Sequence, residues 1–221
     1  IEKASKKEAG GNSRYTNGSY RFAYDNFSDL KKIIPSLKNT KKIDYGKYPK
    51  KSFYDDMIKV TKNKTDKNLT KKLVNNSHDV IYWLSKKGLK FVPIKGKQSF
   101  VVNGVTKYWG GLTLEVKDQG EGLVKSLTNI VIKNGIEIKY EFAAKKIIKK
   151  DNKIVGLKVS HKGKSKDIFC KSVVLACGGF EASSKMRTKY LGKGWDKAKV
   201  RGTKHNTGDG LNMAFEHGAA S

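Results

Sequence analysis

Hydrophobic residues recur at helical spacing in the middle of the chain. From Ser52 to about Lys87 the apolar positions follow an i, i+3/i+4 rhythm, which predicts helices that pack by one face. Gly120–Asn134 shows the same rhythm and is followed by Gly135, a residue typical of a helix C-terminus. A last helix is expected over roughly Gly210–His217. The positions expected to point inward are Phe53, Met57, Val60, Leu73, Val74, His78, Ile81, Tyr82, Leu84, Leu123, Val124, Leu127, Ile130 and Val131.

Strand-like patterns dominate elsewhere, so the fold class is expected to be α/β. Short apolar runs predict strands over 91–93, 136–140, 143–149, 154–160 and 172–176, with a shorter strand near Ile168. Ser99–Trp109 predicts a β-hairpin, because Asn103-Gly104 is a favoured two-residue turn. Residues 1–4 are expected to close a strand. Residues 28–52 are lysine-rich and lack a sustained period, which predicts a linker or a loose helix.

The net charge of +27 raises nucleic acid or an anionic membrane as partners, but its make-up argues against them. Only four of the 47 basic residues are arginines, and the lysines run along nearly the whole chain. Arginine is the residue that most often binds phosphates and the edges of guanine bases. We therefore interpret the lysine content as a general bias of composition and not as a binding surface, and nucleic acid is an unlikely partner. The arginines are Arg14, Arg21, Arg187 and Arg201.

Other partner classes find little support in the composition. Cys170 and Cys177 lack the spacing of a metal site, and no metal cluster is expected. No apolar run approaches the roughly 20 residues of a membrane span, so no transmembrane segment is expected. A cytoplasmic location is predicted. The chain begins at Ile1 without a methionine and ends just past a helix, so it is expected to be an internal fragment of a longer protein.

Three glycine-containing motifs carry the candidate chemistry. Gly10-Gly11-Asn12-Ser13 forms a turn with exposed amides, 173–177 is an apolar run that stops at Gly178-Gly179, and 207–210 reads Thr-Gly-Asp-Gly before a helix. Alone, each also fits an ordinary role: a loop, a buried strand with a tight turn, or a helix N-cap. Together with Glu2, placed where a dinucleotide fold keeps its ribose-binding acid, their order predicts a dinucleotide site, and a flavin is favoured.

On these residues the chain resembles the flavoprotein family of fumarate reductases and succinate dehydrogenases, and within it the FAD-dependent tricarballylate dehydrogenases. Two features depart from the family pattern. The Gly-x-Gly-x-x-Gly turn expected before Glu2 is absent, and Cys177 replaces the usual Thr of an Ala-Thr-Gly-Gly turn. The segments that carry the resemblance are 10–16, 21–24, 108–115, 176–181, 186–188, 190–192 and 194–210.

The resemblance implies a set of FAD-binding residues. Glu2 would bind the adenosine ribose, Ala143 would contact the adenine through its backbone, and Gly178 would allow close approach of the cofactor. Asp209 matches an acid that contacts FAD in the family. His205 is a candidate to face the flavin or the substrate, and no catalytic acid or base is identified. The loop along the pyrophosphate and the isoalloxazine matches Gly11, Asn12, Ser13, Asn17 and Gly18.

The resemblance also implies a fold and a reaction. It implies a FAD-binding domain of glutathione-reductase type, formed by 1–27 and 109–221, with a mostly helical insertion with a β-hairpin over 28–108. The implied activity is a FAD-dependent oxidoreductase acting on a carbon–carbon bond of a carboxylate. For tricarballylate, a hydride passes to the flavin and a base removes the neighbouring proton, giving cis-aconitate. An electron acceptor of unknown identity would be the second partner.

Alternatives to this reaction remain open. Within the family they are a fumarate reductase, an aspartate oxidase or a ketosteroid dehydrogenase. From another class, the chain would be a non-catalytic basic fragment that binds polyanions.

Overall fold

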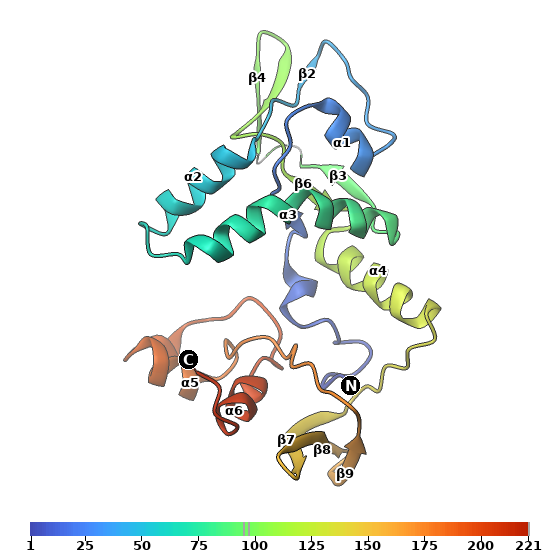
Figure 1. Cartoon of the computed structure of the whole chain (residues 1–221), viewed down its shortest axis with the longest axis vertical. Coiled ribbons are helices and arrows are strands. Elements are labelled where there is room, and N and C mark those ends of the chain that lie inside the picture. Colours follow the sequence, from blue (N-terminus) through green and yellow to red (C-terminus); the bar gives the residue numbers. More distant parts are fainter. Residues whose placement is uncertain (95, 97, 221) are drawn as a thin grey trace. The chain divides into compact units, whose positions relative to one another are not determined.

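The computed structural model describes residues 1–94, 96 and 98–220. Its contacts form two compact units, which we call unit 1 (Ile1–Tyr15 with Val131–Ser221) and unit 2 (Thr16–Ile130). Both units combine helices with strands, in agreement with the predicted mixture (Figure 1). The three-part domain division stays a prediction, and residues 95 and 97 of its insertion lie outside the described residues.

Unit 2 holds two small sheets and most of the helices. One antiparallel sheet has the strand order β1-β6-β3, and in the other, ordered β2-β5-β4, β2 runs parallel to β5. The strands are β1 (Ser19–Tyr20), β2 (Ile43–Asp44), β3 (Phe91–Pro93), β4 (Ser99–Val102), β5 (Val105–Tyr108) and β6 (Leu114–Val116). The helices are α1 (Phe27–Ile33), α2 (Lys50–Val60), α3 (Lys67–Lys86) and α4 (Gln119–Lys133), whose last three residues count with unit 1.

Local sequence signals account for most of these elements. The side chain of Asp66 accepts hydrogen bonds from the amides of Asn68 and Leu69, which fixes the start of α3. Asn103 and Gly104 both adopt positive φ, as the tight turn between β4 and β5 requires. The predicted helices, the hairpin and the strand at 91–93 are thereby confirmed.

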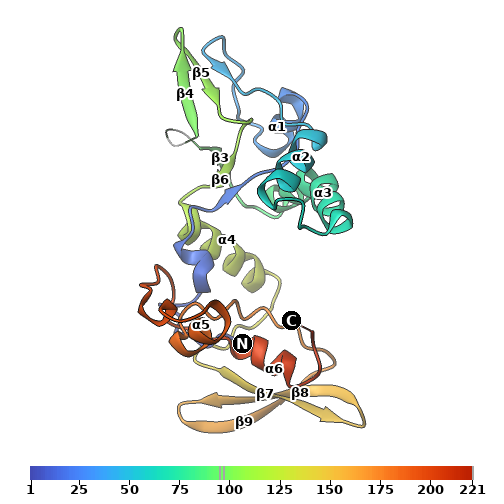
Figure 2. The same cartoon turned by 90° about the vertical axis from the view of Figure 1, so that its left-hand side faces the viewer.

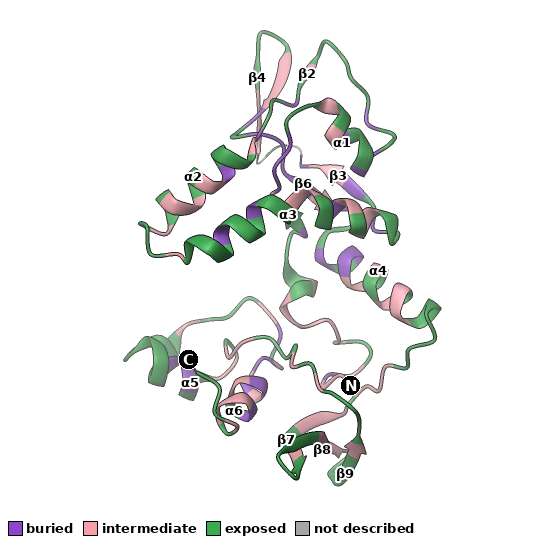
Figure 3. Ribbon diagram, in the orientation of Figure 1, coloured by how far each residue is buried: buried purple, intermediate pink, exposed green. Residues whose placement is uncertain are grey.

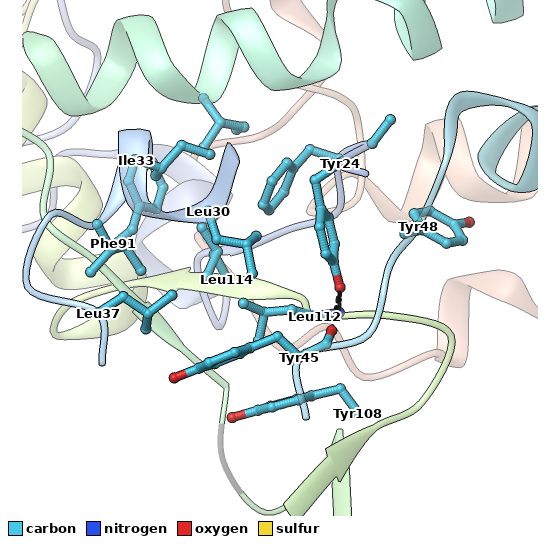
Figure 4. Packing of buried hydrophobic residues seen from close by; sticks show 14 of the residues in the cluster. Tyr24, Leu30, Ile33, Leu37, Tyr45, Tyr48, Phe91, Tyr108, Leu112 and Leu114 are labelled. Carbon is cyan, nitrogen blue, oxygen red and sulfur yellow. Dashed lines mark hydrogen bonds between the residues drawn. The ribbon is translucent and has the colours of Figure 1, made fainter. Parts of the chain in front are cut away.

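The structure decides between the two predictions for residues 28–52. Part of the segment is helical, in α1 and at the start of α2. It is not a linker, because Leu30 is fully buried and Tyr45 and Tyr48 are 7% and 4% exposed. The Tyr24 hydroxyl accepts a hydrogen bond from the Leu112 amide (2.5 Å) and donates one to the Tyr45 carbonyl (2.6 Å), as Figure 4 shows in part. Burial here comes from single apolar residues spaced without a period, so the pattern could not reveal it.

Three residues expected to point inward are exposed instead. Val60 at the end of α2 is 81% exposed, Leu73 on α3 is 52% exposed, and Leu127 on α4 is 39% exposed. In Figure 3 much of the ribbon of these helices has the colour of exposed residues. A helical period identifies residues that share a face, but the packing against each turn sets how much of that face is covered. On α4, for example, the buried residues are Gly120, Gly122 and Leu123, all in the first turns.

Unit 1 is built on a three-stranded antiparallel meander. The strands β7 (Ala143–Lys150), β8 (Lys153–His161) and β9 (Lys164–Phe169) pair in sequence order, and α6 (Asp209–Phe215) lies beside β7 (Figure 2). The strands predicted at 143–149, 154–160 and near Ile168 are confirmed, as is the last helix. The other elements are η1 (Gly11–Tyr15), α5 (Ser184–Leu191) and η2 (Trp195–Lys197).

Three predicted strands of unit 1 do not form. Residues 1–4 and 139–142 are joined by three backbone hydrogen bonds without forming strands. The Glu2 amide donates to the Lys139 carbonyl (2.8 Å), the Phe142 amide to the Glu2 carbonyl (3.0 Å) and the Glu141 amide to the Ala4 carbonyl (3.0 Å). The apolar run at 172–176 is irregular, and Val174 is 88% exposed. A strand needs a partner for its backbone groups, and within the described part of the chain no backbone hydrogen bond pairs 172–176 with a neighbouring segment.

Candidate functional site

Unit 1 contains a cavity of about 710 Å³, a size typical of small-molecule and cofactor sites. Its walls come from the first 13 residues, from the meander and from the segment between Cys170 and Met213. Six of the nine predicted cofactor-binding residues line it, although they come from opposite ends of the sequence. These six are Glu2, Gly11, Asn12, Ser13, Gly178 and Asp209.

Two of the predicted glycine turns meet at the side chain of Asn206. Gly178 has a φ of 72°, and a Cβ there would lie 2.7 Å from Asn206 Nδ2. Gly11 has a φ of 54°, and a Cβ there would lie 3.8 Å from Asn206 Oδ1. Asn206 is only 6% exposed. Gly178 therefore combines a conformation that favours glycine with a space that excludes a side chain.

Asn12 connects the first turn to a distant segment. Its Oδ1 accepts a hydrogen bond from the Thr203 amide at 2.9 Å, across 191 positions of sequence. A Cβ on Gly202 would lie 2.3 Å from the same oxygen, so a side chain there would displace the Asn12 amide. Asn12 thus lines the cavity and at the same time holds Thr203, another residue of its wall.

The two predicted acids are held in different ways. Glu2 Oε1 accepts a hydrogen bond from the Ala4 amide (2.8 Å). Asp209 pairs through Oδ2 with Lys3 Nζ at 2.7 Å, while Thr207 Oγ1 donates to Asp209 Oδ1 at 2.9 Å. Burial raises the pKa of Asp209, but the hydrogen bonds from Lys3 and Thr207 outweigh it and hold that pKa below its usual value. Asp209 is therefore ionised at neutral pH.

Three predicted residues are not among those that line the cavity. Ala143 begins β7 and lies between Phe142 and Ala144, both of which do line it. Asn17 and Gly18 belong to unit 2. Gly18 has a φ of 61° and a Cβ there would lie 3.1 Å from the Gln119 carbonyl carbon, so packing alone accounts for this glycine.

The sequence did not single out Lys3 or Asn206 as part of this site. Lys3 is one of many lysines, and its Nζ contacts residues 202 to 206 positions away. The one available signal was their closeness to the motifs, since Lys3 follows Glu2 and Asn206 precedes the Thr-Gly-Asp-Gly turn.

Arg187 organises the loop that follows α5. It is 8% exposed, and its guanidinium donates to the carbonyls of Trp195 (2.8 Å), Asp196 (2.9 Å) and Ala198 (3.3 Å), and to that of Glu181. The planar fork of arginine can bond several carbonyls at once, which an ammonium cannot do with the same geometry. These hydrogen bonds therefore explain why this lysine-rich chain has an arginine at position 187.

We expect Arg187→Lys to destabilise the chain by about 1.5–3 kcal/mol, because carbonyls bonded to a charged donor lose their partners. Urea unfolding followed by circular dichroism measures the change. Arg201→Lys is the control, because Arg201 is exposed. Equal stability of the Arg187→Lys variant and the parent chain would contradict the role of the guanidinium.

Cys177 lies at the cavity wall against α6. A Cβ on Gly210 would lie 3.0 Å from its Sγ. Although Cys177 retains solvent access, partial burial and then the charge of Asp209 raise the pKa of its thiol. A thiol held in the protonated state is a poor nucleophile, so Cys177 is a packing residue of the wall.

We expect iodoacetamide at about pH 8 to alkylate Cys177 more slowly than Cys170, which is also exposed, because the thiolate is the reactive form. Asp209→Asn should speed the reaction at Cys177 and leave that at Cys170 unchanged. Peptide mass spectrometry of timed samples gives both rates. A faster reaction at Cys177 than at Cys170 in the parent chain would contradict the raised pKa.

His205 also reaches the cavity. Its Nε2 lies 3.4 Å from Glu8 Oε2, and Glu8 also pairs with Lys204 at 2.7 Å. The described residues contain no cluster of three or more His, Cys, Asp or Glu side chains suited to a metal ion. Among the described helices, none is long and apolar enough to cross a membrane.

The residues of the cavity fit a dinucleotide. Glycine turns at 10–11 and 178 leave backbone at the wall without side chains, which a large planar ligand with a pyrophosphate requires. One acid from each end of the chain, Glu2 and Asp209, faces the same volume. This arrangement of glycine turns and acids is therefore compatible with a flavin dinucleotide.

Comparison with known proteins identifies the domain. A family model described as FAD binding domain (FAD_binding_2) matches residues 37–221. The chain is 25% identical over 173 residues to NADH:fumarate oxidoreductase of Klebsiella pneumoniae (strain 342), covering 78% of this chain and 18% of that protein. It is 28% identical over 171 residues to the probable fumarate reductase Ifc3 of Shewanella frigidimarina (strain NCIMB 400), covering 76% and 28%. The chain spans less than a third of the length of these relatives.

Solved structures share the fold. A flavocytochrome c3 fumarate reductase in its open conformation matches with a TM-score of 0.71 at 22% identity, over 96% of this chain and 35% of that one. The 3-ketosteroid-Δ4-(5α)-dehydrogenase of Rhodococcus jostii RHA1 matches with a TM-score of 0.74 at 16% identity, over 99% and 48%.

The names of these relatives and neighbours are those of oxidoreductases, as the sequence resemblance implied. The finer resemblance to tricarballylate dehydrogenases stays a prediction. The chain belongs to the FAD binding domain family, whose cofactor is FAD.

Proposed function

We propose that the unit 1 cavity binds FAD and that the chain is the cofactor-binding part of an oxidoreductase acting on a carbon–carbon bond of a carboxylate. The observation that carries the proposal is the convergence of Glu2, the 11–13 turn, Gly178 and Asp209 on one cavity. Two relatives named for fumarate support the substrate class.

Each residue would have a distinct task. Glu2 would accept hydrogen bonds from the ribose, the turn at Gly11, Asn12 and Ser13 would lie along the pyrophosphate, and Gly178 would admit the ring system. Asp209 would accept from a hydroxyl of the cofactor. Ala143, Asn17 and Gly18 remain proposed contacts. FAD, when bound, supplies hydride transfer.

For the substrate we propose a small polycarboxylate, with tricarballylate as the first candidate. The resemblance of the glycine and arginine motifs to those of tricarballylate dehydrogenases supports this choice. Fumarate, aspartate and a ketosteroid are the alternatives within the family. An electron carrier would complete the reaction, and a cytoplasmic location stays a prediction.

The test is a flavin titration of the protein expressed from its complete reading frame, followed by visible absorbance before and after anaerobic addition of tricarballylate. A bound oxidised flavin that bleaches would support both cofactor and substrate. Flavin that bleaches only with another carboxylate or a ketosteroid would keep the family assignment and replace tricarballylate with that compound as the proposed substrate. No flavin binding would overturn the proposal, and steeply salt-dependent binding of a polyanion would then favour the non-catalytic alternative.

A further inference from the structure

Lys3 is a charged side chain in the cofactor cavity whose three donors are all used. Its Nζ donates to Asp209 Oδ2 at 2.7 Å, to Thr207 Oγ1 at 2.6 Å and to the His205 carbonyl at 3.3 Å. An ammonium has three hydrogens and no acceptor capacity, so this geometry leaves none for a ligand. Lys3 therefore serves the wall of the cavity, although a cation there would first suggest a phosphate contact.

The contacts of Lys3 lie on one short segment, which leads into α6. The segment carries two residues of the cavity wall, His205 and Asp209 at the first residue of the helix, and between them Thr207, which bonds both Lys3 and Asp209. Thr207 Oγ1 accepts from Lys3 and donates to Asp209, which fixes both carboxylate oxygens. The Lys3 and Asp209 side chains are 31% and 35% exposed, so the pair is partly shielded from water.

We propose that Lys3 is a positioning residue for FAD binding, which joins the Glu2 end of the cavity to the Asp209 end and fixes the Asp209 carboxylate. This inference rests on the proposed function of the cavity. Glu2 and Lys3 are adjacent in sequence, so the Lys3–Asp209 contact ties the segment that carries Glu2 to the segment that carries Asp209. Preorganised groups bind more tightly, because no ordering is needed when the ligand arrives.

The ionic state of Asp209 gives this role a specific signature. The titratable groups around its carboxylate are Lys3, Lys145 of β7 and Cys177. Burial is the largest influence on Asp209 and raises its pKa, while Lys3 provides the largest opposing effect. Without Lys3 the largest effect that opposes burial is lost, so the pKa of Asp209 should rise, although Thr207 and Lys145 still lower it.

The experiment measures the FAD affinity of the protein expressed from its complete reading frame by quenching of flavin fluorescence, between about pH 7 and about pH 4.5. We expect Lys3→Met to weaken FAD binding about tenfold at neutral pH. Its affinity should fall more steeply than that of the parent chain as the pH is lowered. Lys3→Arg keeps the charge and should bind FAD more tightly than Lys3→Met.

The matched control is Lys158→Met. Lys158 forms an ion pair of similar geometry with Asp167 (2.6 Å; side chains 47% and 39% exposed), and neither residue lines the cavity. This variant should bind FAD like the parent chain. In the double variant Lys3→Met/Asp209→Asn the added pH dependence should vanish, and the two effects on affinity should not add.

The outcomes separate this inference from the proposed function. A parent chain that binds no FAD overturns both. A parent chain that binds FAD, with Lys3→Met and Lys3→Arg binding within twofold of it, overturns the inference alone. If Lys3→Met does not fold by circular dichroism, the comparison of Lys3→Arg and Asp209→Asn with the parent chain decides, and unchanged affinity in both overturns the inference.

Discussion

Gly178→Ala is expected to weaken FAD binding by at least about tenfold, which corresponds to about 1.4 kcal/mol. The φ of 72° at Gly178 suits glycine, and an alanine held there costs about 1–3 kcal/mol of strain. Its methyl group would also stand 2.7 Å from Asn206 Nδ2, so the buried amide must move. Since Asn206 lies at both the Gly11 and Gly178 turns, its displacement would disturb two walls of the cavity.

Flavin titration and urea unfolding of the same preparations separate affinity from stability. The control is Gly163→Ala in the turn between β8 and β9, where φ is 76° but a Cβ would meet nothing within 4 Å. This control should lose about 1–2 kcal/mol of stability through strain alone and keep its FAD affinity. Equal affinities in the two variants would contradict the role of Gly178 in the cavity wall.

Leu112→Ala is expected to destabilise unit 2 by about 2–5 kcal/mol, because a fully buried leucine leaves a cavity when it is truncated. Leu112 belongs to the main hydrophobic cluster, and its amide donates to the Tyr24 hydroxyl (Figure 4). The substitution keeps that backbone hydrogen bond, so the loss of stability measures the packing of the leucine side chain. Urea unfolding with tryptophan fluorescence measures the effect.

Val60→Ala is the matched control, since Val60 belongs to the same unit and is 81% exposed. It should change stability by less than about 0.5 kcal/mol. A similar loss in both variants would show that the chain is destabilised by any truncation of an apolar residue, and would contradict the burial of Leu112.

Much of the fold could be predicted because its signals are local. The helices at 50–60 and 67–86, the hairpin at 99–108 and the meander at 143–169 follow from periodicity and turn residues that lie within a few positions of each other. The segment 172–176 shows the limit of this reasoning. Its apolar run predicts burial in a strand, but a strand forms only where a second segment supplies hydrogen bonds, and no local pattern reports that.

The candidate site likewise has a part that the sequence predicts and a part that only the folded chain shows. By itself the sequence determined the class of cofactor and predicted the glycine turns and the two candidate acids, because these depend on residue type and order along the chain. Only the tertiary structure decided that Lys3 pairs with Asp209 across 206 positions, that Asn12 bonds Thr203 across 191, and that Asn206 fills the space above Gly178. Such contacts join residues whose separation in sequence carries no period, so they are set by the path of the folded backbone.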